Sequence, residues 1–175
     1  MKIFAETERL VLRELLLSDA EGMFELDRDK EVHRYLGNKP IKTIQQSIDI
    51  ITFVQKQYID NGIGRWAVIE KETNEFIGWS GLKLVQEKIN NHVNYYNIGY
   101  RLRRKFWGKG IATETSIIAR NYGFQQLKLK EIYGTADSQN IASKIVLQKI
   151  GLKYIETFHH NNMRLDWFKI SADIK

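Results

Sequence analysis

A change of hydrophobic pattern around residues 102–110 constrains the fold of this chain more than any other feature. Residues 92–102 (HVNYYNIGYRL) are rich in strand-forming side chains. A helical spacing follows, and one face of that helix carries Ile111, Thr115, Ile118 and Tyr122. Gly108 and Gly110 stand between the two patterns. Because glycine permits a tight turn and a close ligand approach, the chain is predicted to pass from strand to helix through an open turn.

Before this point the sequence predicts one strand, two helices and a hairpin. Residues 8–14 alternate as a strand does, and the spacing Ser18-x-x-Glu21 predicts a capped helix through about Asp29. Thr43-x-x-Gln46 predicts the start of a second helix, which ends at Asn61-Gly62. Ile44, Ile48, Ile51, Val54 and Tyr58 recur in it at helical spacing. The hairpin that follows uses residues 65–71 and 75–85, and with 92–102 it predicts a three-stranded antiparallel meander.

After the glycine turn the pattern predicts a helix, a strand, a second helix and two closing strands. Their expected ranges are 109–126, 131–136, 139–149, 152–158 and 163–170. The core face of the second of these helices is expected to carry Ile141, Ala142, Ile145 and Val146. The element order predicts an α/β fold with a mixed, largely antiparallel twisted sheet, about four flanking helices and one parallel β-helix-β unit. Residues 1–175 are expected to form one domain.

Composition excludes several classes of site. The chain has no cysteine, so disulfides, thiolate nucleophiles and cysteine-based metal sites are absent. None of its four histidines has helical ligand spacing with another, so no metal is expected. No apolar run approaches the ~20 residues that span a bilayer. We therefore expect a cytoplasmic protein without membrane contact.

The formal net charge of +6 favours contact with an anionic partner. Arg103, Arg104, Lys105 and Lys109 concentrate positive charge at the glycine turn. The free N–H groups and the dipole of a helix N-terminus attract phosphate, although the glycines also fit a plain tight turn with solvated basic side chains. The spacing matches neither the dinucleotide fingerprint nor a P-loop.

Two motifs resemble the GNAT superfamily of N-acetyltransferases. Lys105, Gly108 and Gly110 match its coenzyme A motif Q/R-x-x-G-x-G/A, with lysine in place of the first residue. Residues 140–154, from Asn140 and Ser143 to Gly151, resemble the family segment N-x-x-S-x-x-V-x-x-K-x-G-F. The string IGYRL…FWGKGIATE is similar to the branch that acetylates N-terminal alanine or serine of ribosomal proteins. With the segments ETERLVLRELLLSDAE and VHRYLG, the resemblance covers nearly the whole chain.

The resemblance implies direct acetyl transfer from acetyl-coenzyme A to a primary amine, with no metal and no covalent enzyme intermediate. It places pantetheine and the thioester on the splayed strand 98–102, at Tyr100, Arg101 and Leu102, where a backbone N–H near Leu102 polarises the carbonyl. Asn140 would bind the pantetheine arm, and Ser143 would also supply a proton or hydrogen bond to the leaving thiolate. The remaining cofactor contacts are expected from Lys105, Gly108, Lys109, Gly110, Ile111, Ala112 and Thr113.

The acceptor side is less determined by the sequence. We expect its contacts from His33, Tyr35, Trp79 and Asn97, with Tyr96 as a further candidate. Relatives are thought to use a glutamate base at the position of Asn97, which cannot accept a proton. Glu114, Asp166, His33 or an ordered water chain could take that role.

Several acceptors and roles remain open. A protein N-terminus, with a pKa of about 8, loses its proton more easily than a lysine-like amine, with a pKa of about 10.4. A polyamine, an aminoglycoside or another small amine is the alternative acceptor, and a silent acetyl-coenzyme A sensor is an alternative role. Nucleic acid is a disfavoured partner, because the densest basic run sits at one turn rather than along a stripe. A homo-oligomer is compatible with the sequence.

Overall fold

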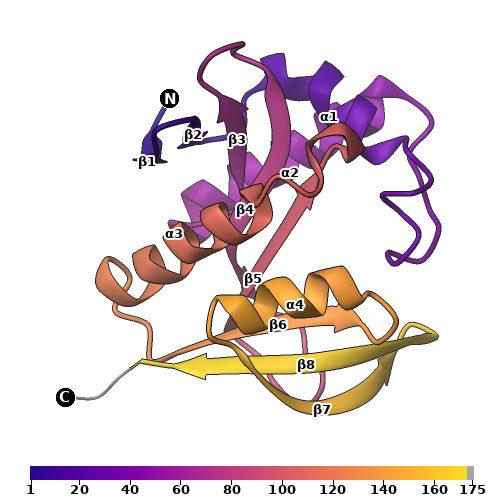
Figure 1. Cartoon of the computed structure of the whole chain (residues 1–175), viewed down its shortest axis with the longest axis vertical. Helices are drawn as coiled ribbons and strands as arrows, with labels where there is room; N and C mark the ends of the chain where they lie inside the picture. The colour runs from indigo at the N-terminus through magenta and orange to yellow at the C-terminus, as the bar shows by residue number, and fades with distance from the viewer. Residues whose placement is uncertain (173–175) are drawn as a thin grey trace.

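The computed structural model describes residues 1–172, whose strands form one eight-stranded sheet (Figure 1). The strands are β1 Ile3–Glu6, β2 Leu10–Arg13, β3 Trp66–Glu70, β4 Phe76–Val85, β5 Tyr95–Leu102, β6 Glu131–Asp137, β7 Lys153–His160 and β8 Met163–Ser171. The α-helices are α1 Ala20–Asp27, α2 Ile44–Asn61, α3 Ile111–Gln125 and α4 Ile141–Lys149. Two short 3-10 helices are η1 Leu17–Asp19 and η2 Arg104–Phe106.

The sheet order is β1-β2-β3-β4-β5-β6-β8-β7. Every neighbouring pair is antiparallel except β5 and β6, which run parallel because α3 carries the chain back between them. This arrangement confirms the predicted mixed, largely antiparallel sheet with one parallel unit and four helices.

The helices cover the two faces of the sheet. On one face α3 and α4 pack over a core that includes Trp66, Leu82, Ile98, Ala119 and Leu147. On the other face α1 and α2 pack over a second core that includes Met23, Leu26, Ile51, Val54 and Ile69. In Figure 1, α3 and α4 lie on the viewer's side of the sheet. Strands β5 and β6 therefore have α3 and α4 on one face, whereas α1 and α2 lie toward the opposite face.

The structure differs from the sequence analysis at two points near the N-terminus. Strand β1 was not predicted, and it is held by Phe4, which stacks on Trp66 with ring centroids 4.7 Å apart. The predicted Ser18-x-x-Glu21 cap is wrong, since α1 begins at Ala20 after the 3-10 turn η1. Asp19 organises that turn: its carboxylate accepts the Leu16 N–H at 2.8 Å and pairs with Arg13.

The cap of α2 agrees better with the sequence. The Thr43 N–H donates to the Gln46 side-chain oxygen at 3.1 Å, as the predicted capping pair requires. The helix ends at Asn61, and Gly62 caps it with φ 69°, a left-handed conformation that glycine tolerates without strain.

The predicted core face of α4 is wrong. Ile141 is 59% exposed and Ile145 is 44% exposed, and Ala142 is also exposed. The helix instead turns Leu147 inward, with Ile150 buried just after its last residue. Ser143 precedes Leu147 by one turn, so the same rotation turns Ser143 toward the sheet.

Two kinds of feature are missing from residues 1–172. None of their helices combines the length and apolar character needed to cross a bilayer. They also contain no group of three or more His, Cys, Asp or Glu side chains arranged to hold a metal ion.

Candidate active site

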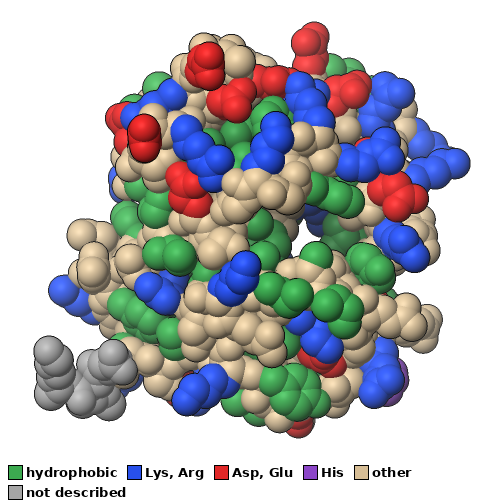
Figure 2. All heavy atoms as spheres, in the orientation of Figure 1, with side chains coloured by type: hydrophobic (Ala, Val, Ile, Leu, Met, Phe, Trp, Pro, Cys, Tyr) green, Lys and Arg blue, Asp and Glu red, His purple; other side chains and the backbone are tan. Residues whose placement is uncertain are grey.

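The sheet opens between β5 and β6. These strands pair only at Asn97–Tyr133 and Ile98–Gly134, although β5 continues to Leu102 and β6 to Asp137. Beyond Ile98 the two strands therefore diverge and leave a gap at the centre of the sheet. Figure 2 shows the surface hollowed between the part of the molecule that carries α3 and the part that carries α4, with Lys and Arg side chains bordering the hollow.

The register of β5 determines which backbone groups face this gap. The Arg103 N–H donates to the Ile77 carbonyl at 2.9 Å, so the backbone of Arg103 points toward the β4 side of β5. Because bonded residues alternate in an antiparallel pair, Arg101 also bonds toward β4, whereas Tyr100 and Leu102 face away from it. The Leu102 carbonyl accepts the Trp107 indole N–H at 2.8 Å. The Leu102 N–H and the backbone of Tyr100 thus face the gap.

The glycine turn has the predicted geometry. Gly108 and Gly110 adopt φ 73° and 75°, in the left-handed region that other residues rarely occupy. Gly110 caps α3, and its carbonyl accepts the Glu114 N–H. The N–H groups of Ile111, Ala112 and Thr113 donate no hydrogen bond to any group within residues 1–172. These three N–H groups and the helix dipole form an anion-binding position.

Most of the basic run at the turn is paired with carboxylates. Arg103 binds Glu75 at 2.6 Å and Lys105 also pairs with Glu75, while Arg104 lies 3.1 Å from Asp29. The hydrogen bond from Lys105, with further contributions from Arg103, lowers the pKa of Glu75 despite the opposing effect of desolvation. The predicted cofactor contact from Lys105 would therefore compete with an ion pair.

Arg9 is a residue of the turn that the sequence did not reveal. Its guanidinium donates to the Lys109 carbonyl at 2.9 Å and pairs with Glu114 at 2.6 Å. It lies 100 residues from the turn in sequence, so no local pattern indicated the contact. The pairing holds Glu114 in a structural role.

The start of α4 meets β5 across the gap. Asn140 caps the helix, because its side-chain oxygen accepts the Ser143 N–H at 3.1 Å. The Tyr100 hydroxyl lies 2.8 Å from the Ser143 hydroxyl and donates to the Ser143 carbonyl at 2.9 Å. Burial raises the pKa of Tyr100 to about 12, so its hydroxyl stays protonated. Sequence reasoning assigned only the Tyr100 backbone to the site and missed this hydroxyl.

Asn97 is held by a buried arginine. Its side-chain oxygen accepts from Arg65 at 2.7 Å, and its amide donates to the Thr135 hydroxyl at 3.3 Å. Arg65 also donates to the Asn97 and Gly81 carbonyls, and no carboxylate within residues 1–172 pairs with it. Burial, and secondarily the charge of Arg101, lowers the pKa of Arg65 to about 9. Sequence reasoning missed Arg65, because a charged residue at the edge of a strand is expected to be exposed to solvent.

Trp79 and His33 lie near the same face of the sheet. The Trp79 ring faces the guanidinium of Arg65 at 5.4 Å and that of Arg101 at 5.1 Å. Arg101 pairs with Asp27 at 2.7 Å, and His33 lies 3.5 Å from the same Asp27 oxygen. The structure therefore links His33, Trp79 and Asn97 through two arginines.

The two predicted tyrosines are placed differently. Tyr35 lies between α1 and α2, and its ring faces Arg34 at 5.4 Å. Tyr96 packs against the core on the α3 side, whereas Trp79 packs against the core on the α1–α2 side. Tyr96 is thus separated from Trp79 by the sheet.

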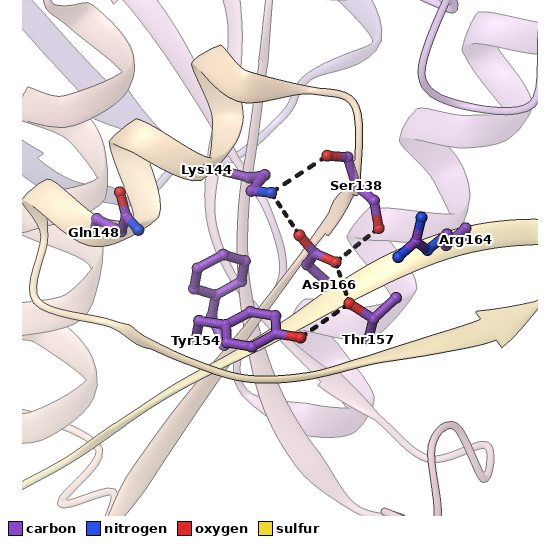
Figure 3. A pocket seen from close by; sticks show the side chains of 8 residues that line it. Ser138, Lys144, Gln148, Tyr154, Thr157, Arg164 and Asp166 are labelled. Carbon is purple, nitrogen blue, oxygen red and sulfur yellow. Dashed lines mark hydrogen bonds and ion pairs between the residues drawn. The ribbon is translucent and has the colours of Figure 1, made fainter.

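Asp166 is part of a closed polar network beside α4 (Figure 3). Its carboxylate accepts hydrogen bonds from Ser138 and Thr157, both at 2.7 Å, and pairs with Lys144 at 2.7 Å. Desolvation raises its pKa, but the hydrogen bonds from Lys144, Ser138 and Thr157 outweigh it and the net shift is downward. Asp166 is therefore a poor proton acceptor, and the network positions α4.

His33 makes a testable contribution to stability. Desolvation, followed by the charge of Arg101, lowers its pKa below the ordinary 6.5, and neither ring nitrogen has a hydrogen-bond partner among the described residues. Below pH 6.5 the unfolded chain binds a proton at His33 more readily than the folded one, so the free energy of unfolding should decrease as pH falls through this range. Urea unfolding at pH 5.5 and 7.5 should show a smaller pH dependence for His33→Gln than for wild type. Identical pH dependence in both proteins would contradict a buried neutral His33.

Comparison with known proteins identifies the relatives of this chain. Residues 9–153 match the family model described as acetyltransferase (GNAT) domain. The uncharacterized N-acetyltransferase p20 of Bacillus licheniformis is 32% identical over 147 residues, which cover 84% of this chain and 80% of that protein. A GNAT-family acetyltransferase from Bacillus anthracis is 25% identical with a TM-score of 0.78, over 98% of both chains. RimL, a ribosomal L7/L12 alpha-N-protein acetyltransferase solved with coenzyme A, shares the fold at 16% identity, with a TM-score of 0.82 over 98% of this chain and 99% of that one.

Proposed function

Since this chain belongs to the GNAT acetyltransferase family, we propose that it joins acetyl-coenzyme A and an amine at the gap between β5 and β6. The observation that carries this proposal is the divergence of the two strands after Ile98, next to the unbonded N-terminus of α3. The gap offers backbone groups for an extended pantetheine arm, and the helix start offers N–H groups for a pyrophosphate. The gap-facing residues 100–102 and the turn residues 108–113 belong to one continuous segment of the chain.

The cofactor would follow the predicted order along this segment. The pyrophosphate would bind residues 108–113, and pantetheine would lie along Tyr100, Arg101 and Leu102 toward Asn140 and Ser143. The Leu102 N–H would donate to the thioester oxygen, which gains negative charge when the amine attacks. The protein thus contributes position and hydrogen bonds rather than a covalent nucleophile.

The reaction needs few protein groups. The neutral amine attacks the thioester carbon, the carbon–sulfur bond breaks, and sulfur leaves as a thiolate that solvent later protonates. In the reaction the Tyr100 hydroxyl would turn from the Ser143 carbonyl to donate to that sulfur, while its oxygen accepts a hydrogen bond from the Ser143 hydroxyl. The proton of the attacking amine would pass through water to the neutral imidazole of His33, which, because its pKa is lowered, is a weak base that would pass the proton on to solvent.

For the acceptor we propose the N-terminal alanine or serine of a protein, because an α-amine is neutral more often near pH 7 than a lysine-like amine. A panel of peptides with these N-termini, spermidine and aminoglycosides tests the proposal by release of free coenzyme A thiol. Acetyl-coenzyme A should also raise the melting temperature by about 5 °C at saturation. Turnover of only small-molecule amines would replace the proposed acceptor, and binding without turnover would favour the sensor role.

Gly108→Glu should weaken coenzyme A binding by about tenfold or more, because it places a carboxylate beside the pyrophosphate position. Gly62→Glu is a matched control: both glycines have φ near 70°, and a Cβ at either position meets no atom within 4 Å. The two variants therefore share the backbone strain and the added charge. Equal coenzyme A affinity in the two variants, measured by calorimetry, would contradict the pyrophosphate position.

A further inference from the structure

Three cations occupy one face of the sheet beside the gap. We call Arg65, Lys83 and Arg101 the basic cluster. Trp79 pairs with Arg101 and Lys83 pairs with Asn97 across β4 and β5, so these side chains alternate onto the same face. Trp79 packs against the α1–α2 core, which identifies this face as the one opposite α3 and α4.

The basic cluster has too little negative charge to balance it. Asp27 is the one carboxylate that pairs with it among residues 1–172, through Arg101. Arg65 bonds only to neutral groups, namely two carbonyls and the Asn97 side chain. Lys83 is part-buried and makes no hydrogen bond or ion pair within the described residues. Desolvation, and then the charge of Arg65, lowers the pKa of Lys83, while the exposed Glu87 opposes this effect.

This position is close to where the proposed reaction occurs. Arg101 is adjacent in sequence to Leu102, whose N–H faces the gap. The Tyr100 hydroxyl points to α4 on the other face of the sheet, so the cluster and the proposed leaving-group donors lie on opposite sides of β5. An acceptor approaching from the Trp79 side would therefore meet the basic cluster before it reaches the thioester.

On the basis of the proposed function, we infer that the acceptor amine carries an anionic group, a carboxylate or a phosphate, that binds Lys83 and Arg101 while the amine reaches the thioester. Lys83 supplies an unpaired ammonium, and the Arg101 guanidinium lies over the Trp79 ring, 5.1 Å from its centroid. An anionic group there satisfies the unpaired charge, whereas a polyamine would bring more positive charge to it.

The spacing limits the size of this acceptor. Side chains on one strand face repeat at about 6.8 Å, and Lys83, opposite Asn97, is two repeats from Arg101, so an anion held between these two side chains lies roughly 10 Å from the thioester position beside Leu102. A small amino acid, or a protein N-terminus followed by an acidic residue, spans this distance. The same cations also disfavour an ammonium near them and so favour the reactive neutral amine.

The test compares amines that differ only in the anionic group. For carboxylates the pair is Ala-Asp amide and Ala-Asn amide, and for phosphates it is phosphoethanolamine and ethanolamine, with spermidine as the polycation. Thiol release gives kcat and KM at constant ionic strength. We expect kcat/KM to be about tenfold higher for the anionic member of at least one pair, mainly through a lower KM. The pair that shows the difference identifies the source of the charge.

Variants of Lys83 assign the effect. Lys83→Met should bring the ratio of kcat/KM for the anionic amine to kcat/KM for the neutral amine close to one. Lys83→Arg should retain most of this preference. Lys153→Met is the control, because Lys153 is exposed on β7 and its loss changes the net charge equally. If Lys153→Met reduces the preference as much as Lys83→Met, the assignment to the basic cluster is wrong.

A binding measurement separates this inference from the proposed function. Thermal stabilisation by each amine with coenzyme A bound reports acceptor preference even without turnover. Stronger stabilisation by the anionic members supports the inference in either case. Equal turnover and equal stabilisation within both pairs, or a preference for spermidine, overturns it while leaving acetyl transfer intact. Absence of both acetyl-coenzyme A binding and thiol release overturns the proposed function itself.

Discussion

Tyr100→Phe is expected to lower kcat for acetyl transfer by about a hundredfold, with KM for acetyl-coenzyme A changed by less than about threefold. The change removes one oxygen, whose hydroxyl bonds both the hydroxyl and the carbonyl of Ser143. If that hydroxyl stabilises the departing thiolate, its loss affects the transition state and leaves ground-state cofactor binding nearly intact. Stopped or continuous thiol assays at saturating acetyl-coenzyme A measure the effect directly.

Ser143→Ala removes the second hydroxyl of the Tyr100–Ser143 pair and tests whether the two hydroxyls act together. Because both hydroxyls act on one sulfur, the double variant should lose little more activity than Tyr100→Phe alone. Tyr133→Phe is the matched control, since its hydroxyl bonds Glu131 rather than α4. A kcat for Tyr100→Phe that equals that of Tyr133→Phe would show that the Tyr100 hydroxyl only braces α4 against β5.

The sequence predicted best those features that depend on local conformation. The glycines at 108 and 110 were expected to permit a tight turn, and both adopt positive φ immediately before α3. The alternating strands 65–102 and the helical spacing after Ile111 also correspond to observed elements. In each case the residue type itself limits the backbone, so neighbours in sequence carry the information.

Contacts between distant segments could not be predicted in the same way. Arg65, Arg9 and the Tyr100 hydroxyl each acquire partners only when the sheet and α4 assemble. The core face of α4 was wrong for a related reason. Its apolar residues surround the helix, and only packing against β6 and the closing strands determines which of them becomes buried.

Charge was the least predictable property of the site. The basic run at the glycine turn suggested positive potential for phosphates, yet Glu75 and Asp29 pair with three of its members. Only Lys109 of the run has no carboxylate partner among the described residues, and further unpaired positive charge lies on Lys83, within a strand where lysine is expected to be exposed. Net charge indicates that an anion is a suitable partner, but the ion pairs determine where it can bind.

The second large effect is expected at Gly78, which lies at an irregularity in the β3–β4 pairing. A Cβ built on Gly78 would lie 2.2 Å from the Arg101 carbonyl oxygen and 2.8 Å from the Leu102 Cα. Both are backbone atoms in the centre of the sheet, so neither can move away as a side chain does. Gly78→Ala should therefore lower the free energy of unfolding by about 3 kcal/mol.

Gly134→Ala separates a backbone clash from a side-chain clash. Its Cβ would approach the Leu147 Cδ2 atom at 2.7 Å, but that atom ends a side chain that can shift, so we expect a loss of about 1 kcal/mol. Urea unfolding measures both values.

The alanine at 78 can be accommodated only by displacing Arg101 and Leu102, the residues proposed to hold the thioester. Gly78→Ala should consequently lose acetyl transfer at temperatures where it remains folded, whereas Gly134→Ala should retain most of it. Equal losses of stability and activity in the two variants would mean that the β5 backbone yields freely, and the rigid positioning proposed for the Leu102 N–H would then be wrong.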